Sequence, residues 1–164
     1  MNYAGLKTTD IANGPGVRVT LFVSGCRRHC KNCFNKETWD FNYGNPFEKE
    51  TMNTIIDALG KEYIEGFSLL GGEPFEKENR ETVLNIVRTV KEKFPNKTIW
   101  CYSGFTFEEL IDDARNILEY VDVLVDGAFI EEKKNLRLQF RGSENQRLID
   151  VKKTLECGNV VTIE

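Results

Sequence analysis

A repeated order of strand-like and helix-like segments runs through most of this sequence. Apolar, β-branched stretches end at glycine, and most are followed by residues whose apolar side chains recur with helical spacing. Parallel strands joined by helices produce this alternation, in right-handed βαβ units. We therefore predict an α/β fold with a mainly parallel sheet. Strands are expected at residues 17–23, 67–70, 98–102, 121–125 and 159–163, and helices within residues 45–60, 83–94 and 106–118.

Capping residues set the expected helix ends. Asn45 is the predicted N-cap of the first helix, and Gly60 is its predicted stop. Thr106 and Glu109 predict a capping box at the start of the third helix. Four or five strands are too few to close an eight-stranded barrel. We expect residues 1–164 to form a single domain built on an open sheet, or partial (βα) barrel.

The predicted strands share one chemical feature at their carboxyl ends. Glycine stands there beside small, thiol or ionisable residues. In parallel α/β folds, ligands bind at this edge of the sheet. We therefore predict that the active site lies where these strands end. The four strand ends are Ser24-Gly25-Cys26, Gly71-Gly72-Glu73, Ser103-Gly104 and Asp126-Gly127.

Charge and hydropathy exclude several classes of partner. The net charge is −4 and acidic and basic residues are interleaved, so no polyanionic partner is indicated. No apolar run approaches the roughly 20 residues that a membrane span requires. Residues 1–8 lack the apolar stretch of a signal peptide. We expect a cytoplasmic protein that binds neither membranes nor nucleic acid.

Three of the five cysteines lie together, directly after the first predicted strand, as Cys26-x3-Cys30-x2-Cys33. In a reducing compartment, clustered cysteines are more often metal ligands than disulfide partners. Thiolates suit iron–sulfur clusters, and a [4Fe–4S] cluster with three cysteine ligands keeps one iron open to another molecule. The spacing therefore favours a catalytic iron–sulfur site with these three residues as ligands.

Two other uses of the thiols stay open on the residues alone. A zinc site would need His29, Cys101 or Cys157 as a fourth ligand, and no second pair of close cysteines completes the usual zinc pattern. Redox-active or structural thiols are the third interpretation. Because free cysteine is among the most buried residue types, we interpret the isolated Cys101 and Cys157 as core residues.

The cysteine spacing after the first strand, together with Gly71-Gly72-Glu73-Pro74 after the second, resembles the radical S-adenosylmethionine superfamily. The resemblance implies that the open iron binds the amino and carboxylate groups of S-adenosylmethionine. It implies that one electron from the cluster cleaves the C5′–S bond, giving methionine and a 5′-deoxyadenosyl radical. The glycine-rich turn is expected to lie against the methionine ammonium, because glycine lets the backbone approach a ligand closely.

Further cofactor contacts follow from the same resemblance. Many superfamily members have an aromatic residue just before the last cysteine, which stacks near adenine. Asn32 occupies that position here, and Phe34 follows the cysteine instead, so both are expected adenine contacts. At the strand ends, Ser103 and Asp126 are also expected to contribute to cofactor binding, Asp126 by contacting ribose or a cation or by ordering its loop.

Several segments also resemble the activating proteins of anaerobic ribonucleoside-triphosphate reductases. They are residues 100–105, 123–127 and 141–150, which begins Arg-Gly-Ser-x-Asn-Gln-Arg. Residues 13–18 (Asn-Gly-Pro-Gly-Val-Arg) resemble the leader shared by activases of glycyl-radical enzymes in general. This resemblance implies that the radical takes a hydrogen atom from a glycine of the large reductase subunit, leaving a glycyl radical. It implies a flavodoxin- or ferredoxin-like electron donor. Arg141 and Arg147 are expected to bind the reductase, since arginine pairs well with carboxylates and carbonyls.

Three other functions compete with this one. Two are an activase of another glycyl-radical enzyme, of the pyruvate formate-lyase type, and a small-molecule radical enzyme. The Arg-Gly-Ser-x-Asn-Gln-Arg segment argues against both. The third, from a different class, is a non-catalytic zinc-binding interaction module. It leaves the Gly-Gly-Glu-Pro turn unexplained.

Overall fold

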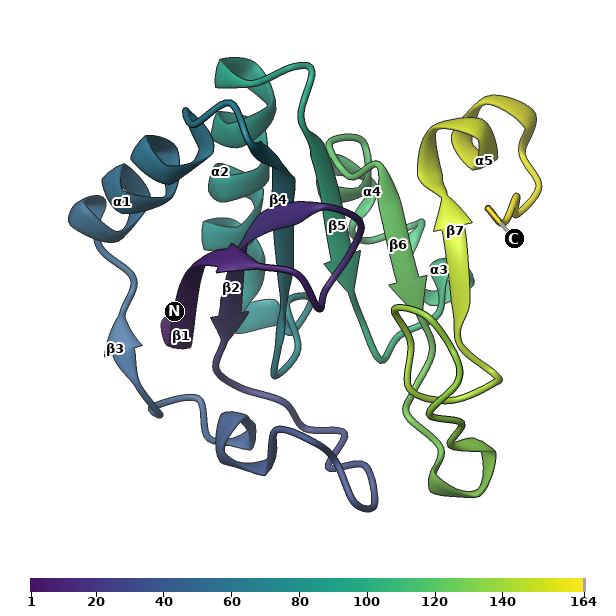
Figure 1. Cartoon of the computed structure of the whole chain (residues 1–164). Helices are drawn as coiled ribbons and strands as arrows, with labels where there is room; N and C mark the ends of the chain where they lie inside the picture. Colours follow the sequence, from purple (N-terminus) through teal and green to yellow (C-terminus); the bar gives the residue numbers. More distant parts are fainter. Residues whose placement is uncertain (164) are drawn as a thin grey trace.

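The computed structural model describes residues 1–163 and contains a seven-stranded sheet with the strand order β3-β1-β2-β4-β5-β6-β7. Its centre is a run of four parallel strands, as the alternating pattern predicts. In Figure 1 the arrowheads of β2, β5 and β6 point to the same edge of the sheet. The four strands are β2 (Val17–Val23), β4 (Ile64–Gly71), β5 (Thr98–Tyr102) and β6 (Val123–Asp126).

Three antiparallel strands flank this centre, and none of them was predicted. They are β1 (Asn2–Asp10) beside β2, β3 (Asn45–Pro46) beside β1, and β7 (Arg147–Asp150) beside β6. The strand predicted at residues 159–163 is wrong, because this segment makes only an isolated bridge between Thr162 and Ile149. The sheet is open, with β3 and β7 as its edges.

The helices follow the predicted alternation in part. The helix predicted within residues 83–94 is confirmed as part of α2, and Gly60 is confirmed as the C-cap of α1. A short helix after β7 was not predicted. The helices are α1 (Lys49–Leu59), α2 (Lys77–Lys93), α3 (Phe107–Leu110), α4 (Arg115–Leu118) and α5 (Val151–Cys157), with short 3-10 helices η1 (Lys36–Trp39) and η2 (Glu131–Lys133).

The start of α1 differs from the prediction. Asn45 is not an N-cap, because Asn45 and Pro46 form β3, in which Asn45 pairs with Tyr3 of β1. Glu48 is the N-cap instead, and its backbone N–H donates to Thr51 Oγ1 at 3.2 Å. Pairing with the N-terminal strand therefore delays the helix by one turn.

The helix predicted over residues 106–118 is divided into α3 and α4. The capping box at its start is confirmed, since the Thr106 N–H donates to Glu109 Oε1 at 2.9 Å and the Glu109 N–H donates to Thr106 Oγ1 at 3.3 Å. Asp112 and Asp113 lie in the turn between the two short helices. Aspartate is a poor helix former, which explains why an uninterrupted apolar stripe does not give one helix.

The sheet has two unlike faces. Alternate residues of the parallel strands point toward α1, α2, α3 and α4 and form the main hydrophobic core with them. In Figure 1, α2 and α4 lie behind the strands. On the opposite face, Trp100, Val123, Val125 and Leu148 form a smaller apolar cluster. The candidate site lies on this second face.

A fully buried arginine fastens the segment before β2 to the rest of the sheet. Arg18 Nε donates to Ser68 Oγ at 2.8 Å, and its Nη2 donates to the Thr98 carbonyl at 2.9 Å. Its Nη1 donates to the Pro15 carbonyl at 3.1 Å. Burial lowers the pKa of Arg18 to about 10. The Asn-Gly-Pro-Gly-Val-Arg segment is thus tied to β4 and β5 through its own last residue.

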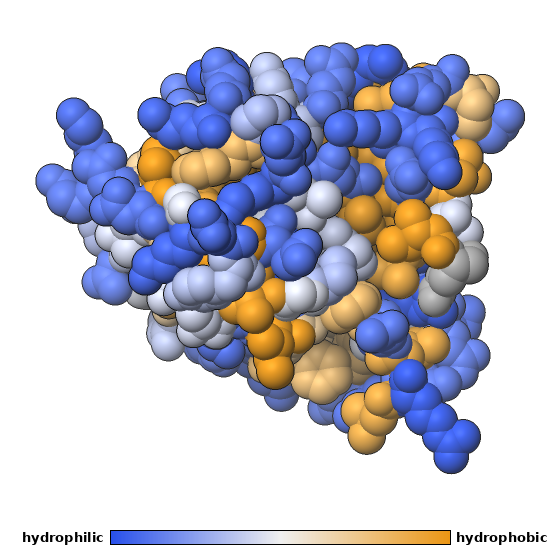
Figure 2. All heavy atoms as spheres, turned by 45° about the horizontal axis from the view of Figure 1, so that its top comes forward, coloured by the Kyte–Doolittle hydropathy of each residue, from blue (hydrophilic) through white to orange (hydrophobic). Residues whose placement is uncertain are grey.

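Polar and charged side chains dominate the face of the molecule that Figure 2 shows. Figure 2 looks toward the edge at which the parallel strands begin and shows a mostly hydrophilic face with separate hydrophobic patches. Within residues 1–163, no helix combines the length and the apolar character needed to cross a membrane.

Candidate active site

A cavity of about 730 Å³ lies at the carboxyl ends of the parallel strands. Its wall includes Cys26 after β2, Gly72 after β4, Ser103 and Gly104 after β5, and Gly127 after β6. The four strand ends therefore meet at one site, as the sequence predicts. The volume is typical of a cofactor or small-molecule site.

All three clustered cysteines line this cavity, and each is half-buried. The loop that carries them leaves β2 at Gly25, whose N–H donates to the Thr38 carbonyl at 2.7 Å. The Cys26 N–H donates to the Trp39 carbonyl at 3.1 Å. These two bonds close the cysteine loop, residues 26–33, against η1 and turn its thiols toward one space.

The backbone of the cysteine loop is strained at two positions. His29 and Asn32 have φ angles of 48° and 56°, in the left-handed region that residues other than glycine seldom adopt. The ring of His29 stacks on Trp39 with centroids 4.3 Å apart and planes 12° apart. Strain of this kind persists where surrounding contacts enforce it, and it is concentrated at functional sites.

The Gly-Gly-Glu-Pro turn is bonded directly to the start of the cysteine loop. The Gly72 N–H donates to the Val23 carbonyl at 2.8 Å, and the Glu73 N–H donates to the Gly25 carbonyl at 2.8 Å. A Cβ on Gly72 would lie only 2.7 Å from both the Gly25 and the Thr38 carbonyl oxygens. Glycine is therefore required here by the close approach of two backbones.

The carboxylate of Glu73 joins the ends of β4 and β5. Its Oε1 accepts from the Gly104 N–H at 2.7 Å, and its Oε2 accepts from Ser103 Oγ at 2.8 Å and from the Phe75 N–H at 3.0 Å. Burial raises the pKa of Glu73 to about 7. The side chains of Glu73 and Ser103 thus bond to each other and brace the wall of the cavity.

Comparison with known proteins bears on the cysteine loop. The model of the family described as a 4Fe-4S single cluster domain matches residues 12–149. The chain is 45% identical to the anaerobic ribonucleoside-triphosphate reductase-activating protein of Vibrio cholerae over 148 residues, covering 89% of this chain and 96% of that protein. The proteins of the same name from Pasteurella multocida and Escherichia coli are 43% and 41% identical, and 95% and 96% of their lengths are covered.

The chain belongs to the family of anaerobic ribonucleoside-triphosphate reductase-activating proteins. The resemblance of its segments to these activating proteins is thereby confirmed. The relatives are matched over nearly their whole length, and the 4Fe-4S family model covers both the cysteine loop and the Gly-Gly-Glu-Pro turn.

The donor set of this family member fits a cluster with three protein ligands. Cys26, Cys30 and Cys33 are three thiols on the wall of one cavity, and the loop presents no fourth thiol. Burial raises the pKa of Cys26 and of Cys30, so binding of iron has to displace their protons. A cubane with three such ligands retains one iron for a ligand that the protein does not provide.

A single metal ion requires a different arrangement of ligands from the one that a [4Fe–4S] cluster requires. Within residues 1–163, no group of three or more His, Cys, Asp or Glu side chains is arranged to hold one ion. In a [4Fe–4S] cluster each thiolate binds a different iron, so the three sulfurs need not point to one position. His29, the possible fourth zinc ligand, is exposed and stacked on Trp39, and it does not line the cavity.

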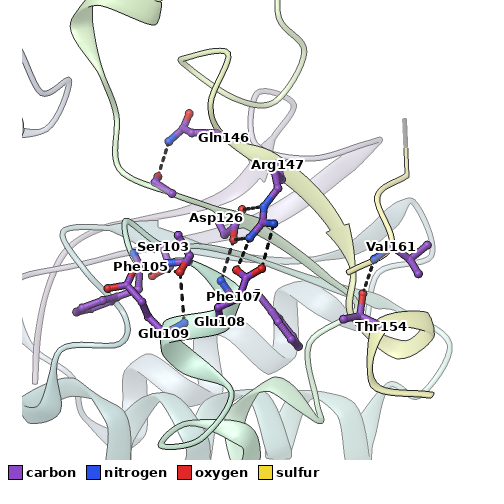
Figure 3. A network of polar contacts seen from close by, with 12 residues as sticks. Ser103, Phe105, Phe107, Glu108, Glu109, Asp126, Gln146, Arg147, Thr154 and Val161 are labelled. Carbon is purple, nitrogen blue, oxygen red and sulfur yellow. Dashed lines mark hydrogen bonds and ion pairs between the residues drawn. The ribbon is translucent and has the colours of Figure 1, made fainter. Parts of the chain in front are cut away.

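Asp126 and Arg147 lie outside the lining of the cavity. Figure 3 shows the Arg147 guanidinium between the carboxylates of Asp126 and Glu108. Asp126 Oδ2 also accepts from the Phe107 N–H, at the start of α3, at 2.8 Å. The predicted ribose contact and the predicted partner contact are therefore joined to each other by an ion pair.

The other predicted site residues occupy different positions. Phe34 lines the cavity, is 61% exposed and contacts Phe129 with ring centroids 5.0 Å apart. Arg141 and the two glycines of the turn also line it. Asn32 is exposed and Pro74 is buried, and neither lies in the lining. Of the two expected adenine contacts, only Phe34 reaches the cavity.

Sequence reasoning missed a large part of the cavity wall. The segment between β6 and β7, residues 127–146, covers one side of it, and Gln146 Nε2 holds that segment closed by donating to the Gly127 carbonyl at 3.0 Å. The polar Arg-Gly-Ser-x-Asn-Gln-Arg segment was the available signal, although it was assigned to the partner. The segment contributes Gly127, Phe129, Asn135, Leu136, Leu138, Phe140, Arg141, Gly142 and Gln146 to the wall.

The two isolated cysteines differ from each other. Cys101 is fully buried in the main core, as predicted. Cys157 is exposed at the end of α5, so its assignment to the core is wrong. The prediction rested on the general burial of cysteine and could not anticipate a short terminal helix on the surface.

Proposed function

We propose that this protein activates an anaerobic ribonucleoside-triphosphate reductase by generating a glycyl radical in the large reductase subunit. It is then an oxidoreductase of the radical S-adenosylmethionine class, and its cofactors are a [4Fe–4S] cluster and S-adenosylmethionine. One observation carries this proposal. Three half-buried thiols share a cavity with the Gly-Gly-Glu-Pro turn, in a chain of the activating-protein family.

Cys26, Cys30 and Cys33 would hold the cluster, and the backbone of Gly71 and Gly72 would lie beside the methionine end of the cofactor. When bound, the cluster and S-adenosylmethionine supply one-electron cleavage of the C5′–S bond and hydrogen-atom transfer from glycine, releasing methionine and 5′-deoxyadenosine. Phe34 is the proposed adenine contact, because its ring lines the cavity next to the cysteine loop.

The protein's own contribution is to position these groups and to exclude water. Glu73 fixes the ends of β4 and β5 relative to each other through two hydrogen bonds, from Ser103 Oγ and from the Gly104 N–H. Phe22, Leu70, Val125 and Phe140 provide apolar walls. A dry, rigid cavity protects a reactive carbon radical from side reactions and keeps it close to its target.

The fold and partner assignments complete the proposal. We propose that residues 1–164 form one domain and that the open sheet corresponds to a partial (βα) barrel of the radical S-adenosylmethionine type. Arg141 remains the proposed reductase contact, since it lines the cavity. Arg147 would act through its ion pair with the buried Asp126. A flavodoxin- or ferredoxin-like protein is the proposed electron donor.

The test is anaerobic reconstitution with iron and sulfide, followed by reduction with dithionite and addition of S-adenosylmethionine and the purified reductase. We expect cluster absorbance, 5′-deoxyadenosine and a glycyl-radical signal in electron paramagnetic resonance. Each of Cys26→Ala, Cys30→Ala and Cys33→Ala should abolish all three, whereas the exposed Cys157→Ala should retain them. Tight zinc binding without a cluster would refute the proposal and favour the zinc-binding module. A radical in pyruvate formate-lyase alone would identify a different activase.

A further inference from the structure

Basic residues are concentrated in the cysteine loop and in the three residues that follow it. Residues 26–36 contain four basic residues and no acidic residue, whereas the whole chain has a net charge of −4. This stretch is an exception to the interleaving of opposite charges along the chain. All four basic residues are exposed, and they are Arg27, Arg28, Lys31 and Lys36.

Two of these four cations have partners within the fold, and two do not. Arg27 forms ion pairs with two glutamates near the start of α2, and the Arg28 guanidinium lies over the ring of Phe105, 4.8 Å from its centroid. The side chains of Lys31 and Lys36 form no ion pair or hydrogen bond with any residue from 1 to 163. Their ammonium groups are therefore available to a partner from outside.

The cysteine loop has an inner and an outer side. Cys26, Cys30 and Cys33 line the cavity, whereas Lys31 and Lys36 are exposed and lie outside its lining. Lys31 is part of a turn that the Cys33 N–H closes by donating to the Cys30 carbonyl at 3.1 Å. A protein bound at Lys31 would thus be separated from the thiols by little more than this turn of backbone.

The outer side of the loop is hydrophilic. The exposed apolar side chains of Phe34 and Leu136 line the cavity instead. Tight protein interfaces have an apolar centre, whereas electron-transfer encounters are small and are steered by charge. The cavity rim therefore suits a partner that inserts into the cavity, and the outer side suits one that binds briefly. The exposed residues of 26–36 outside the lining are Arg27, His29, Lys31, Asn32 and Lys36.

We propose that Lys31 and Lys36 dock an acidic one-electron carrier protein on the outer side of the cysteine loop. The inference rests on the proposed function, which requires an electron donor, and it names the surface that receives this donor. Carboxylates around the redox group of the carrier would face the two ammonium groups, which speeds the encounter and fixes its orientation. One electron then passes from the reduced carrier to the oxidised cluster. The carrier is oxidised and the cluster reduced by one electron, and no atom is transferred between them.

The test uses a purified flavodoxin as the acidic carrier and the reconstituted, cluster-loaded protein. Lys31→Glu/Lys36→Glu reverses both charges, so the dissociation constant for flavodoxin should rise about 10-fold at low ionic strength. The difference from the wild type should shrink as salt is added, because salt screens exposed charges. Formation of 5′-deoxyadenosine should slow with reduced flavodoxin as the donor. It should equal that of the wild type with excess dithionite, a small reductant that needs no docking surface.

Two further variants control the experiment. Lys93→Glu/Lys153→Glu makes the same change in net charge at exposed lysines and should match the wild type in flavodoxin affinity. Lys93 ends α2 and Lys153 is in α5, both near the edge of the sheet at which the parallel strands begin (Figure 1). Lys31→Gln/Lys36→Gln removes the charges without adding carboxylates and should raise the dissociation constant less. It replaces the glutamate variant if that variant binds less iron than the wild type.

An unchanged dissociation constant for flavodoxin in the charge-reversed loop would overturn the inference, and so would equal weakening in Lys93→Glu/Lys153→Glu. Lower affinity for the purified reductase, with unchanged flavodoxin affinity, would assign the two lysines to the reductase and overturn it too. Slower product formation with excess dithionite, again with unchanged flavodoxin affinity, would show that they act on the cluster and not on the carrier. Failure of the wild type to form 5′-deoxyadenosine with dithionite would instead refute the proposed function.

Discussion

Asp126 and Arg147 are opposite each other in the antiparallel pair of β6 and β7, and their side chains form a two-point ion pair. Arg147 Nε donates to Asp126 Oδ1 at 3.0 Å, and Nη2 donates to Oδ2 at 2.5 Å. The two residues bracket the segment 127–146, which forms one side of the cavity wall. The pair therefore closes the base of that segment.

Arg147→Ala should destabilise the protein by about 2–4 kcal/mol, measured as the free energy of unfolding in urea. Asp126 is 1% exposed, so the substitution leaves a buried carboxylate with only the Phe107 N–H as a donor. Hydrogen exchange in residues 127–146 should also accelerate, since the base of the segment is no longer closed.

Arg115→Ala is the control for loss of an arginine ion pair. Arg115 pairs with Glu119 one helical turn away, and both side chains are more than half exposed. Exposed pairs of this kind contribute about 0.3–0.5 kcal/mol. Equal stability of Arg147→Ala and Arg115→Ala would contradict a structural role for the Asp126–Arg147 pair.

Gly72→Ala should disturb the cysteine loop as well as the turn that contains Gly72. The added methyl group would lie 2.7 Å from two backbone carbonyl oxygens, those of Gly25 and Thr38, and neither belongs to a flexible side chain. We expect a loss of about 1–3 kcal/mol in unfolding free energy, typical of overpacking, and less iron bound after reconstitution. Gly60→Ala is the control, because its nearest neighbours are at ordinary contact distances. Wild-type iron content in Gly72→Ala would count against this coupling.

The central strands could be predicted from the sequence because parallel strands, buried on both faces, are continuous apolar runs. β1 and β7 carry no such run. β1 contains Lys7, Thr8 and Thr9, and β7 begins at Arg147 and ends at Asp150. Their strand character comes from pairing with β2 and β6, which is a tertiary interaction that a local pattern does not contain.

The candidate site, like the fold, could be predicted from the sequence only in part. Residues fixed by a motif, such as Cys26 and Gly72, lie in the cavity wall because the motif follows directly after a strand. Side-chain pairing could not be predicted. Asp126 and Arg147 are 21 positions apart, and only the β6–β7 register makes them partners.

Glu73 should make the stability of the cluster-free protein depend on pH. Its pKa is about 7 in the folded state, against 4.5 for an unperturbed glutamate. Between these values the folded state binds more protons than the unfolded state, so the free energy of unfolding falls as pH rises from 4.5 to 7. The fall attributable to Glu73 is about 3 kcal/mol, and the contribution is constant above pH 7.

Glu73→Gln should remove this slope, because glutamine does not titrate. The measurement is a set of urea titrations between pH 4.5 and 8, with the exposed Glu62→Gln as the control that retains the wild-type slope. A slope in Glu73→Gln equal to that of the wild type would show that other groups cause the pH dependence.

The five cysteines should separate into three classes toward iodoacetamide under anaerobic conditions. Cys157 is exposed and should react in every folded sample. Cys101 should react only after unfolding, since it is fully buried and burial raises its pKa well above the usual value, whereas the thiolate is the reactive form. The half-buried Cys26, Cys30 and Cys33 should react in the cluster-free protein and be protected in the reconstituted one.

Mass spectrometry of peptides after labelling checks this order directly. The reconstituted protein should carry one adduct, at Cys157, and the iron-depleted protein should carry further adducts within residues 26–33. Cys157→Ser should carry none when reconstituted, which controls for adventitious labelling. Equal labelling of the cysteine loop with and without iron would show that these thiols do not hold the cluster, and it would remove the basis of the proposed chemistry, because no other three thiols in the described chain share a cavity.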